Sequence, residues 1–155
     1  MTARAGRRYA LDTNCFIEGF RTPQGVRELQ QFHRLFAPFE YLSVVVAQEL
    51  RAGVRSPADR RRLERHVLAP FERTGRVLTP STQAWHDSGD LLADLVRRDG
   101  IELRRVSKSF GNDVLLALSC REAGVVLVTA NARDFARIAR LAPFDFVAPW
   151  PAPSA

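Results

Sequence analysis

The chain has 155 residues, and its 23 Lys and Arg residues exceed its 17 Asp and Glu residues, which gives a formal net charge of +6 with histidine neutral. This length predicts one domain over residues 1–155 with an ordinary hydrophobic core, and it excludes a second full domain. Hydrophobic residues make up 46% and charged residues 26% of the chain, a balance that excludes disorder throughout.

The first half of the chain alternates segments that are typical of strands and of helices. Short apolar runs predict strands, and apolar residues at three- and four-residue steps predict helices. Ser56 followed by Pro57 is a typical helix start. The expected elements are a strand over 9–11, a helical turn over 13–20, a helix over 23–39, a strand over 41–46, a helical segment over 47–53, a helix over 57–73 and an edge strand over 76–79.

The second half continues the same alternation and closes with a Pro-rich tail. The expected elements are a helix over 81–98, a loop over 101–110, a helix over 112–123, a strand over 125–129, a helix over 131–140 and a last strand over 145–147. The core of the domain is expected at about 9–147, between a basic extension over 1–8 and a tail over 149–155 that we expect to be loosely held.

Strands that alternate with helices predict an α/β fold, in which helices cover both faces of a parallel sheet. Ligands of such sheets bind beyond the carboxyl ends of the strands, where the chain turns into the next helix. Functional residues are therefore expected at these turns.

The sequence gives no sign of a membrane or secreted protein. No apolar run approaches the roughly 20 residues that a spanning helix needs, and the basic first residues are not followed by a secretory apolar region. We therefore expect a cytoplasmic protein with no membrane partner. Cys15 and Cys120 lie beside apolar residues without metal-site spacing, so we expect buried, reduced thiols.

The positive charge leaves two interpretations open. Clustered arginine attracts polyanions such as nucleic acids. However, Lys108 is the only lysine, and a bias toward arginine can also come from genome composition. Charge alone does not decide between them.

Four acidic residues occupy the predicted turns. Asp12 directly follows the first strand, Glu49 lies one turn after the second, and Asp134 lies one turn after the strand over 125–129, while Asp113 begins a helix. Two unit charges about 4 Å apart repel by on the order of 4 kcal/mol at an effective dielectric near 20. A compensating cation is therefore expected, and Mg²⁺ or Mn²⁺ suits carboxylate ligands without His or Cys.

Such a cation would lower the pKa of a bound water, orient it in line with a phosphodiester and offset charge on the leaving oxygen. These properties point to hydrolysis of nucleic acid. Helix N-termini near the acids would favour the negative charges, and neighbouring polar residues would orient them. These polar residues are Thr13 and Asn14 beside Asp12, Asn112 beside Asp113, and Thr129 and Asn131 before Asp134.

Four sequence blocks together resemble a known family. They are LDTN at 11–14, VAQELRAG at 46–53, NDVLLA at 112–117 and VTANARDF at 128–135. In this order, and each on the expected element, they resemble the four blocks of PIN-domain ribonucleases, and their spacing resembles the VapC-type toxins of bacterial toxin–antitoxin modules. The resemblance spans about residues 9–147, nearly the whole chain.

The resemblance implies a three-layer α/β/α sandwich around a parallel sheet and a Mg²⁺- or Mn²⁺-dependent endoribonuclease that leaves 5′-phosphate and 3′-hydroxyl ends. It also implies an RNA substrate, a cognate antitoxin whose C-terminal segment wraps the toxin, and a homodimer or a toxin–antitoxin hetero-oligomer. By position, the family's acidic quartet corresponds to Asp12, Glu49, Asp113 and Asp134, and its polar supports correspond to Thr13 and Asn131.

Each acid alone also has an ordinary structural explanation. Asp12 could be only a helix N-cap, and Asp113 could likewise only cap a helix. Asp134 could pair with Arg133 or Arg137 on a solvated face. Glu49 is harder to explain in this way, because it lies in a mostly apolar stretch where unpaired carboxylates are rare. The quartet is persuasive only as a set.

Several arginines and aromatic residues are candidate contacts. Arg51 and Arg55 near Glu49, and Arg133 near Asp134, could contact RNA or the antitoxin. The run over 60–62 with Arg65 is typical of a solvated face, although it could contact RNA phosphates or acidic antitoxin residues. The aromatic residues that could face a second copy or the antitoxin, or else belong to the core, are Phe32, Phe36, Phe39 and Trp85.

Two other functions remain open at this point. A PIN-like protein-interaction or RNA-binding module without turnover would need no intact acidic quartet. A phosphatase with Asp12 as nucleophile is disfavoured, because the second acid usual two residues later is Asn14 here. Glycine-rich dinucleotide and nucleoside triphosphate motifs do not occur.

Overall fold

The fold is taken from a computed structural model, which describes residues 6–100, 102, 104 and 107–153. Within these ranges, five short strands form one sheet in the order β3-β2-β1-β4-β5, and each neighbouring pair is parallel. The strands are β1 (Tyr9–Leu11), β2 (Glu40–Ser43), β3 (Val77–Leu78), β4 (Val126–Val128) and β5 (Phe146–Val147). The predicted α/β fold with a parallel sheet is confirmed.

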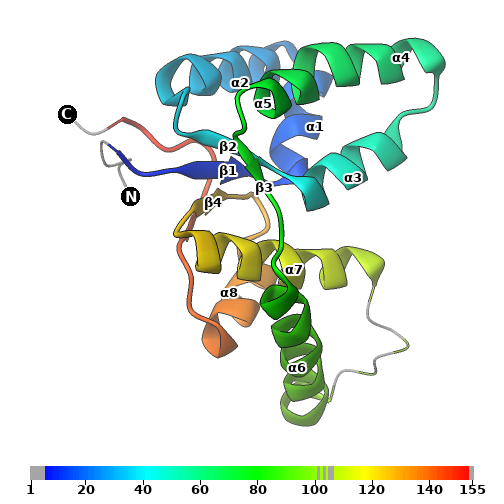
Figure 1. The fold of residues 1–155 in the computed structure, drawn as a ribbon, viewed down its shortest axis with the longest axis vertical. Helices are drawn as coiled ribbons and strands as arrows, with labels where there is room; N and C mark the ends of the chain where they lie inside the picture. Colours follow the sequence, from blue (N-terminus) through cyan, green and yellow to red (C-terminus); the bar gives the residue numbers. More distant parts are fainter. Residues whose placement is uncertain (1–5, 101, 103, 105–106, 154–155) are drawn as a thin grey trace.

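Helices cover both faces of this sheet. Figure 1 shows α2, α4 and α5 above it and α6, α7 and α8 below it. The helices are α1 (Thr13–Arg21), α2 (Pro23–Phe36), α3 (Val44–Gly53), α4 (Pro57–Arg62), the π-helical segment η1 (Leu63–Leu68), α5 (Ala69–Arg73), α6 (Thr82–Asp99), α7 (Lys108–Ala123) and α8 (Ala132–Leu141).

The core is centred on β1, β4 and α7. Every residue of β1 and β4 is buried, as expected for the middle strands of a parallel sheet. The middle of α7 is buried from Asp113 to Cys120 without interruption, which marks it as a helix enclosed by the protein. Asp113 therefore enters the site from a rigid, buried element.

Helices α1 and α2 approach each other closely at a glycine. A Cβ atom at Gly25 would lie 2.1 Å from the backbone oxygen of Glu18. Only a residue without a side chain fits there. This contact fixes α2 against α1, the helix that Asp12 caps.

The second strand is shorter than predicted. Residues 44–46 were expected to extend it, but the structure ends β2 at Ser43 and begins α3 at Val44. The Ser43 hydroxyl accepts a hydrogen bond of 3.1 Å from the Val45 N–H and caps the helix. Capping and burial of the valines therefore outweigh their β preference.

Several further elements differ from the sequence predictions. The helix predicted over 23–39 ends at Phe36, where the Ala37 N–H bonds to the His33 carbonyl before Pro38. The helix predicted from residue 112 begins at Lys108, inside the predicted loop, because Ser107 caps it. The helix predicted over 57–73 contains η1, and the last three strands are each one or two residues shorter.

The tail is not loosely held over its described part, 149–153. The Trp150 indole N–H donates to Glu28 at 2.9 Å, and its ring packs against Phe32 with centroids 5.5 Å apart. Pro151 is buried. Apolar burial thus outweighs the mobility expected of a terminus. Residues 1–5 of the basic extension, 101, 103 and 105–106 of the predicted loop, and 154–155 lie outside the described residues.

The prediction for the two cysteines agrees with the structure. Cys15 and Cys120 are buried free thiols, and burial raises the pKa of the Cys15 thiol to about 12, which keeps it protonated. In the part of the chain that is described, no helix is both long and apolar enough to cross a membrane.

Candidate active site

The four predicted acids come together beyond the carboxyl ends of the central strands. Asp12 directly follows β1, Glu49 lies on α3 after β2, and Asp134 lies in the first turn of α8 after β4. Asp113 is in the second turn of α7. Burial and the charges of the other three acids raise its pKa to about 8. Burial is the largest cause of this shift, and the smaller contributions of the three charges show that the other carboxylates lie near Asp113.

Asp12 uses its two carboxylate oxygens differently. Its Oδ1 accepts a hydrogen bond of 2.8 Å from the Thr13 N–H and caps α1. Its Oδ2 accepts from the Thr129 hydroxyl at 2.7 Å and from the Asn14 amide at 3.0 Å. Burial, and to a lesser extent the charge of Glu49, raise the pKa of Asp12 despite these hydrogen bonds. Asp12 therefore caps α1 with one oxygen and still lies in the acidic site with the other, so its two predicted roles are compatible.

Glu49 is held by two residues that we expected to support other acids. The Thr13 hydroxyl donates to its Oε2, and the Asn112 amide donates to its Oε1 at 2.9 Å. Both donors lie next to another acid in sequence, Thr13 beside Asp12 and Asn112 beside Asp113. Glu49 is thereby tied to both neighbouring parts of the site.

Asn131 links the other two acids. Its amide nitrogen donates to Asp134 at 3.1 Å and reaches Asp113 at 3.5 Å. Its side-chain oxygen accepts from the Asp134 N–H and caps α8. The polar residues predicted around the acids all lie in the site. Asn14 and Asn131 contact the acids to which they were assigned, whereas the side chains of Thr13, Asn112 and Thr129 contact other acids of the quartet.

None of the ion pairs within the described ranges involves the four acids. Their negative charge is balanced only by neutral hydrogen-bond donors. Such a group of oxygen ligands fits a hard divalent cation by its chemistry. In the arrangement observed for the described residues, no three acid, imidazole or thiol groups already converge as a complete ligand set. The acids instead hold their polar neighbours, so binding a cation would require some side chains to rotate.

The candidate arginine contacts are not equivalent. Arg51 donates from Nε to Glu64 at 2.7 Å and from Nη2 to Glu72 at 3.2 Å, so its guanidinium joins α3 to η1 and α5. Arg55 and Arg133 are exposed. Their predicted contacts with RNA or an antitoxin remain predictions.

The aromatic residues considered as partner contacts divide into two groups. Phe32 and Phe36 are buried and pack with Tyr9 in the core. Phe39 and Trp85 are 40% and 60% exposed. Only these last two leave a large apolar surface for a partner.

Residues 9–141 match the family model described as the PIN domain. The chain belongs to the PIN domain family. None of the curated proteins compared with it matches by sequence. The PIN assignment agrees with the position of the four acids at one edge of the sheet.

Solved structures show the same fold at low sequence identity. The chain is similar to a protein in the crystal structure of DNA-bound VapBC from Salmonella typhimurium, with a TM-score of 0.67 and 24% identity over 92% of this chain and 98% of that one. It is similar to FitAcB from Neisseria gonorrhoeae and to DNA-bound VapBC2 from Rickettsia felis, each with a TM-score of 0.64 and 20% identity over 92% of this chain and 98% of the other.

Proposed function

We propose that this PIN protein is a VapC-type toxin, a divalent-metal-dependent endoribonuclease that a cognate antitoxin neutralises. The observation that carries the proposal is the acidic site itself. Four acids from four different elements meet at the ligand-binding edge of the sheet, and the pKa of Asp113 rises to about 8 there. Asp12 and Asp113 are buried, and Glu49 and Asp134 are half-buried. Such a group of carboxylates without a cationic side chain is unfavourable for folding and is typical of a functional site.

Asp12, Glu49, Asp113 and Asp134 would hold Mg²⁺ or Mn²⁺. When bound, the cation would supply a water of lowered pKa and positive charge near the leaving oxygen of a phosphodiester. The acids supply the negative charge that attracts it. The four acids offer only oxygen ligands, which suit Mg²⁺ or Mn²⁺ better than zinc.

The polar residues of the site keep the carboxylates in place. Thr129, which is 1% exposed, fixes Oδ2 of Asp12. Thr13 and Asn112 restrain Glu49 from two elements. These hydrogen bonds limit how far the carboxylates must move when a cation binds, although some side chains rotate to reach it.

The proposed partner is an antitoxin, because the similar structures are described as VapBC or FitAB complexes and one as a member of the VapBC toxin–antitoxin systems. We also expect a homodimer or a toxin–antitoxin hetero-oligomer. The exposed Phe39 and Trp85 are candidate contacts in such an assembly. Coexpression with any short reading frame found beside this gene, followed by copurification, tests this part of the proposal.

The catalytic proposal is tested with the Asp113→Asn variant, which keeps the side-chain shape and removes the charge. Purified wild-type protein is expected to cut total RNA with Mg²⁺ or Mn²⁺ and to stop in EDTA. Asp113→Asn is expected to lower the rate by about a hundredfold or more. Asp90→Asn on the exposed surface of α6 is the matched control and should cut like the wild type.

Circular dichroism verifies that each variant is folded. Undiminished metal-dependent cutting by Asp113→Asn would contradict the assignment of the site. Wild-type protein that produces no metal-dependent fragments from any RNA would instead favour a PIN-like module without turnover.

A further inference from the structure

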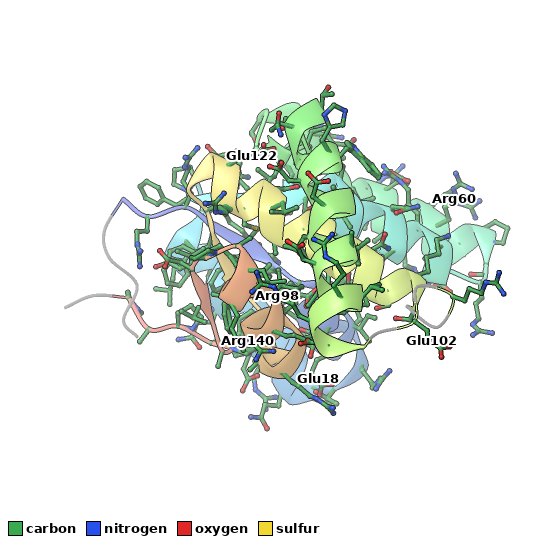
Figure 2. The ribbon with its side chains drawn as sticks, turned by 90° about the horizontal axis from the view of Figure 1, so that it is seen from below. Glu18, Arg60, Arg98, Glu102, Glu122 and Arg140 are labelled. Atoms are coloured by element: carbon green, nitrogen blue, oxygen red, sulfur yellow. The ribbon has the colours of Figure 1, made fainter. Side chains whose placement is uncertain are left out.

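An exposed basic surface lies on the segment that follows α3, outside the acidic site. It is formed by arginines of α4, η1 and α5, and we call it the arginine surface. Figure 2 shows Arg60 projecting at the right edge of the molecule, the side toward which β1 runs in Figure 1. The arginine surface consists of Arg60, Arg61, Arg62, Arg65 and Arg73, all of them exposed.

The acids of this segment are directed to other partners. Glu64 and Glu72 accept hydrogen bonds from Arg51 of α3. Asp59 accepts from the Ser56 hydroxyl at 2.8 Å and from Arg62 at 3.4 Å. Within the described residues, no ion pair is formed by the other four arginines of the surface. Glu64 and Glu72 also line one of the hollows of this surface, but both are paired with Arg51. Four guanidinium groups therefore stay without an ion pair among the described residues.

The arginine surface surrounds two adjoining hollows. One has a volume of about 450 Å³ and includes Arg60, Arg65 and Arg73 in its walls. The other has a volume of about 310 Å³ and shares Arg61 and Arg65 with the first. The only apolar lining residues are Ala58 in one and Ala69 in the other. A protein interface normally centres on large apolar or aromatic anchors, and these hollows have none.

The segment is also placed next to the acidic site. Helix α3 carries Glu49, a residue of the site, and Arg51, which joins α3 to η1 and α5. The two residues are separated by about 3 Å along the helix axis but by about 200° around it, so they point to opposite sides of a helix that is about 10–12 Å wide with its side chains. A strand of nucleic acid a few nucleotides long could therefore reach from the acids to the arginine surface.

We propose that the arginine surface binds the phosphate backbone of the RNA substrate outside the cleavage site. This inference rests on the proposed ribonuclease function and extends it to how the substrate is held. Guanidinium groups form bidentate hydrogen bonds to phosphate. The segment over 60–73 extends for about 20 Å at the helical rise per residue. Its arginines are spread along this length, so they can contact several successive phosphates of a nucleic acid backbone. The binding is independent of RNA sequence, because it reads only the backbone.

The test measures binding without catalysis. Wild-type protein in EDTA is titrated into a short fluorescein-labelled single-stranded RNA of mixed sequence, and anisotropy is followed at several salt concentrations. The test variant combines Arg60→Gln, Arg61→Gln and Arg65→Gln. The control variant, with the same change in charge, combines Arg21→Gln, Arg27→Gln and Arg34→Gln on α1 and α2.

The test variant is expected to bind RNA at least about tenfold more weakly than the wild type. In a plot of the logarithm of the binding constant against the logarithm of the salt concentration, each phosphate contact contributes about 0.7 to the steepness of the slope for a single strand. Loss of three contacts should therefore make the slope shallower by about 2. The control variant should change neither value. In a parallel cleavage assay with Mg²⁺, the test variant should show a raised KM with little change in kcat.

Three results would overturn the inference: wild-type protein that does not bind the RNA, a test variant that binds like the wild type, and a control variant that loses as much affinity as the test variant. An oligoglutamate peptide is the probe for an acidic protein partner. If the three substitutions abolish binding of this peptide and leave RNA binding unchanged, the surface is a protein-docking site instead. Wild-type protein that binds RNA through these arginines without ever cleaving it would contradict the proposed function alone.

Discussion

Replacing Asp113 by Asn is expected to stabilise the metal-free protein at pH 8 and to leave its stability nearly unchanged near pH 4. Burial and the charges of Asp12, Glu49 and Asp134 raise the pKa of Asp113 from 3.8 to about 8. Between these values the folded protein holds a proton that the unfolded chain releases. The free energy of unfolding therefore falls as the pH rises through this window. Asn carries no charge at any of these pH values, so the variant lacks this loss.

The structure sets the size of the effect. A difference of one pH unit in pKa corresponds to about 1.4 kcal/mol, so the complete difference would be about 6 kcal/mol. Asp113 is 7% exposed and lies at the edge of the sheet, where water and side chains can rearrange and absorb part of this energy. We expect Asp113→Asn to stabilise the protein by about 2–4 kcal/mol at pH 8, or about 5–12 °C in melting temperature for a domain of this size.

The measurement is thermal and urea unfolding in EDTA from pH 4 to pH 8, with Asp90→Asn on α6 as the control. The control should stay within about 0.5 kcal/mol of the wild type. Adding Mg²⁺ at pH 8 should stabilise the wild type and have little effect on Asp113→Asn, because only the wild type has the complete set of acids. The reasoning would be refuted if the difference between Asp113→Asn and the wild type did not change with pH.

Two further substitutions test the packing and the support of the site. Gly25→Ala would place a Cβ atom 2.1 Å from the Glu18 carbonyl oxygen, so we expect urea unfolding to show a destabilisation of about 2–4 kcal/mol. Gly89→Ala on α6 is its control, because a Cβ there meets no atom within 4 Å. The control should stabilise the protein by about 0.5–1 kcal/mol. Thr129→Val removes the hydroxyl that donates to Asp12 at 2.7 Å. This variant should lose about 1–3 kcal/mol of unfolding free energy and should cleave RNA more slowly. Unchanged unfolding and cleavage would show that this hydrogen bond does not matter.

Helices and strands could be predicted from the sequence where the conformation that the residues prefer locally is also the one that tertiary packing favours. Strands β1 and β4 are short, fully buried apolar runs, and both were predicted within one residue at each end. The prediction was wrong where the preferences conflict. Val44, Val45 and Val46 favour a strand locally, yet they lie in α3 because Ser43 caps a helix whose apolar side is buried. Only the packed structure shows which preference prevails.

The positions of the site's acids could be predicted from the sequence, but most of their hydrogen-bond partners could not. The turn after a parallel strand is a recurring position for ligands, so Asp12 and Asp134 could be placed from the sequence. The partners of Glu49 could not, because Thr13 and Asn112 come from separate elements whose spacing is set by packing. The bound position of Trp150 was likewise missed, since its partners Glu28 and Phe32 are more than a hundred residues away.

The surroundings of Asp113 show why the acidic group is better explained by function than by stability. The residues after Asp113 in α7, from Val114 to Cys120, are all buried, so the helix is an interior element in which an apolar side chain at position 113 would fit. A carboxylate there is desolvated and repelled by three other acids. Within the described residues it gains only the weak contact with Asn131 at 3.5 Å. A position that opposes folding in this way is expected where a ligand compensates for it, and a divalent cation is the ligand that this oxygen-rich group attracts most strongly.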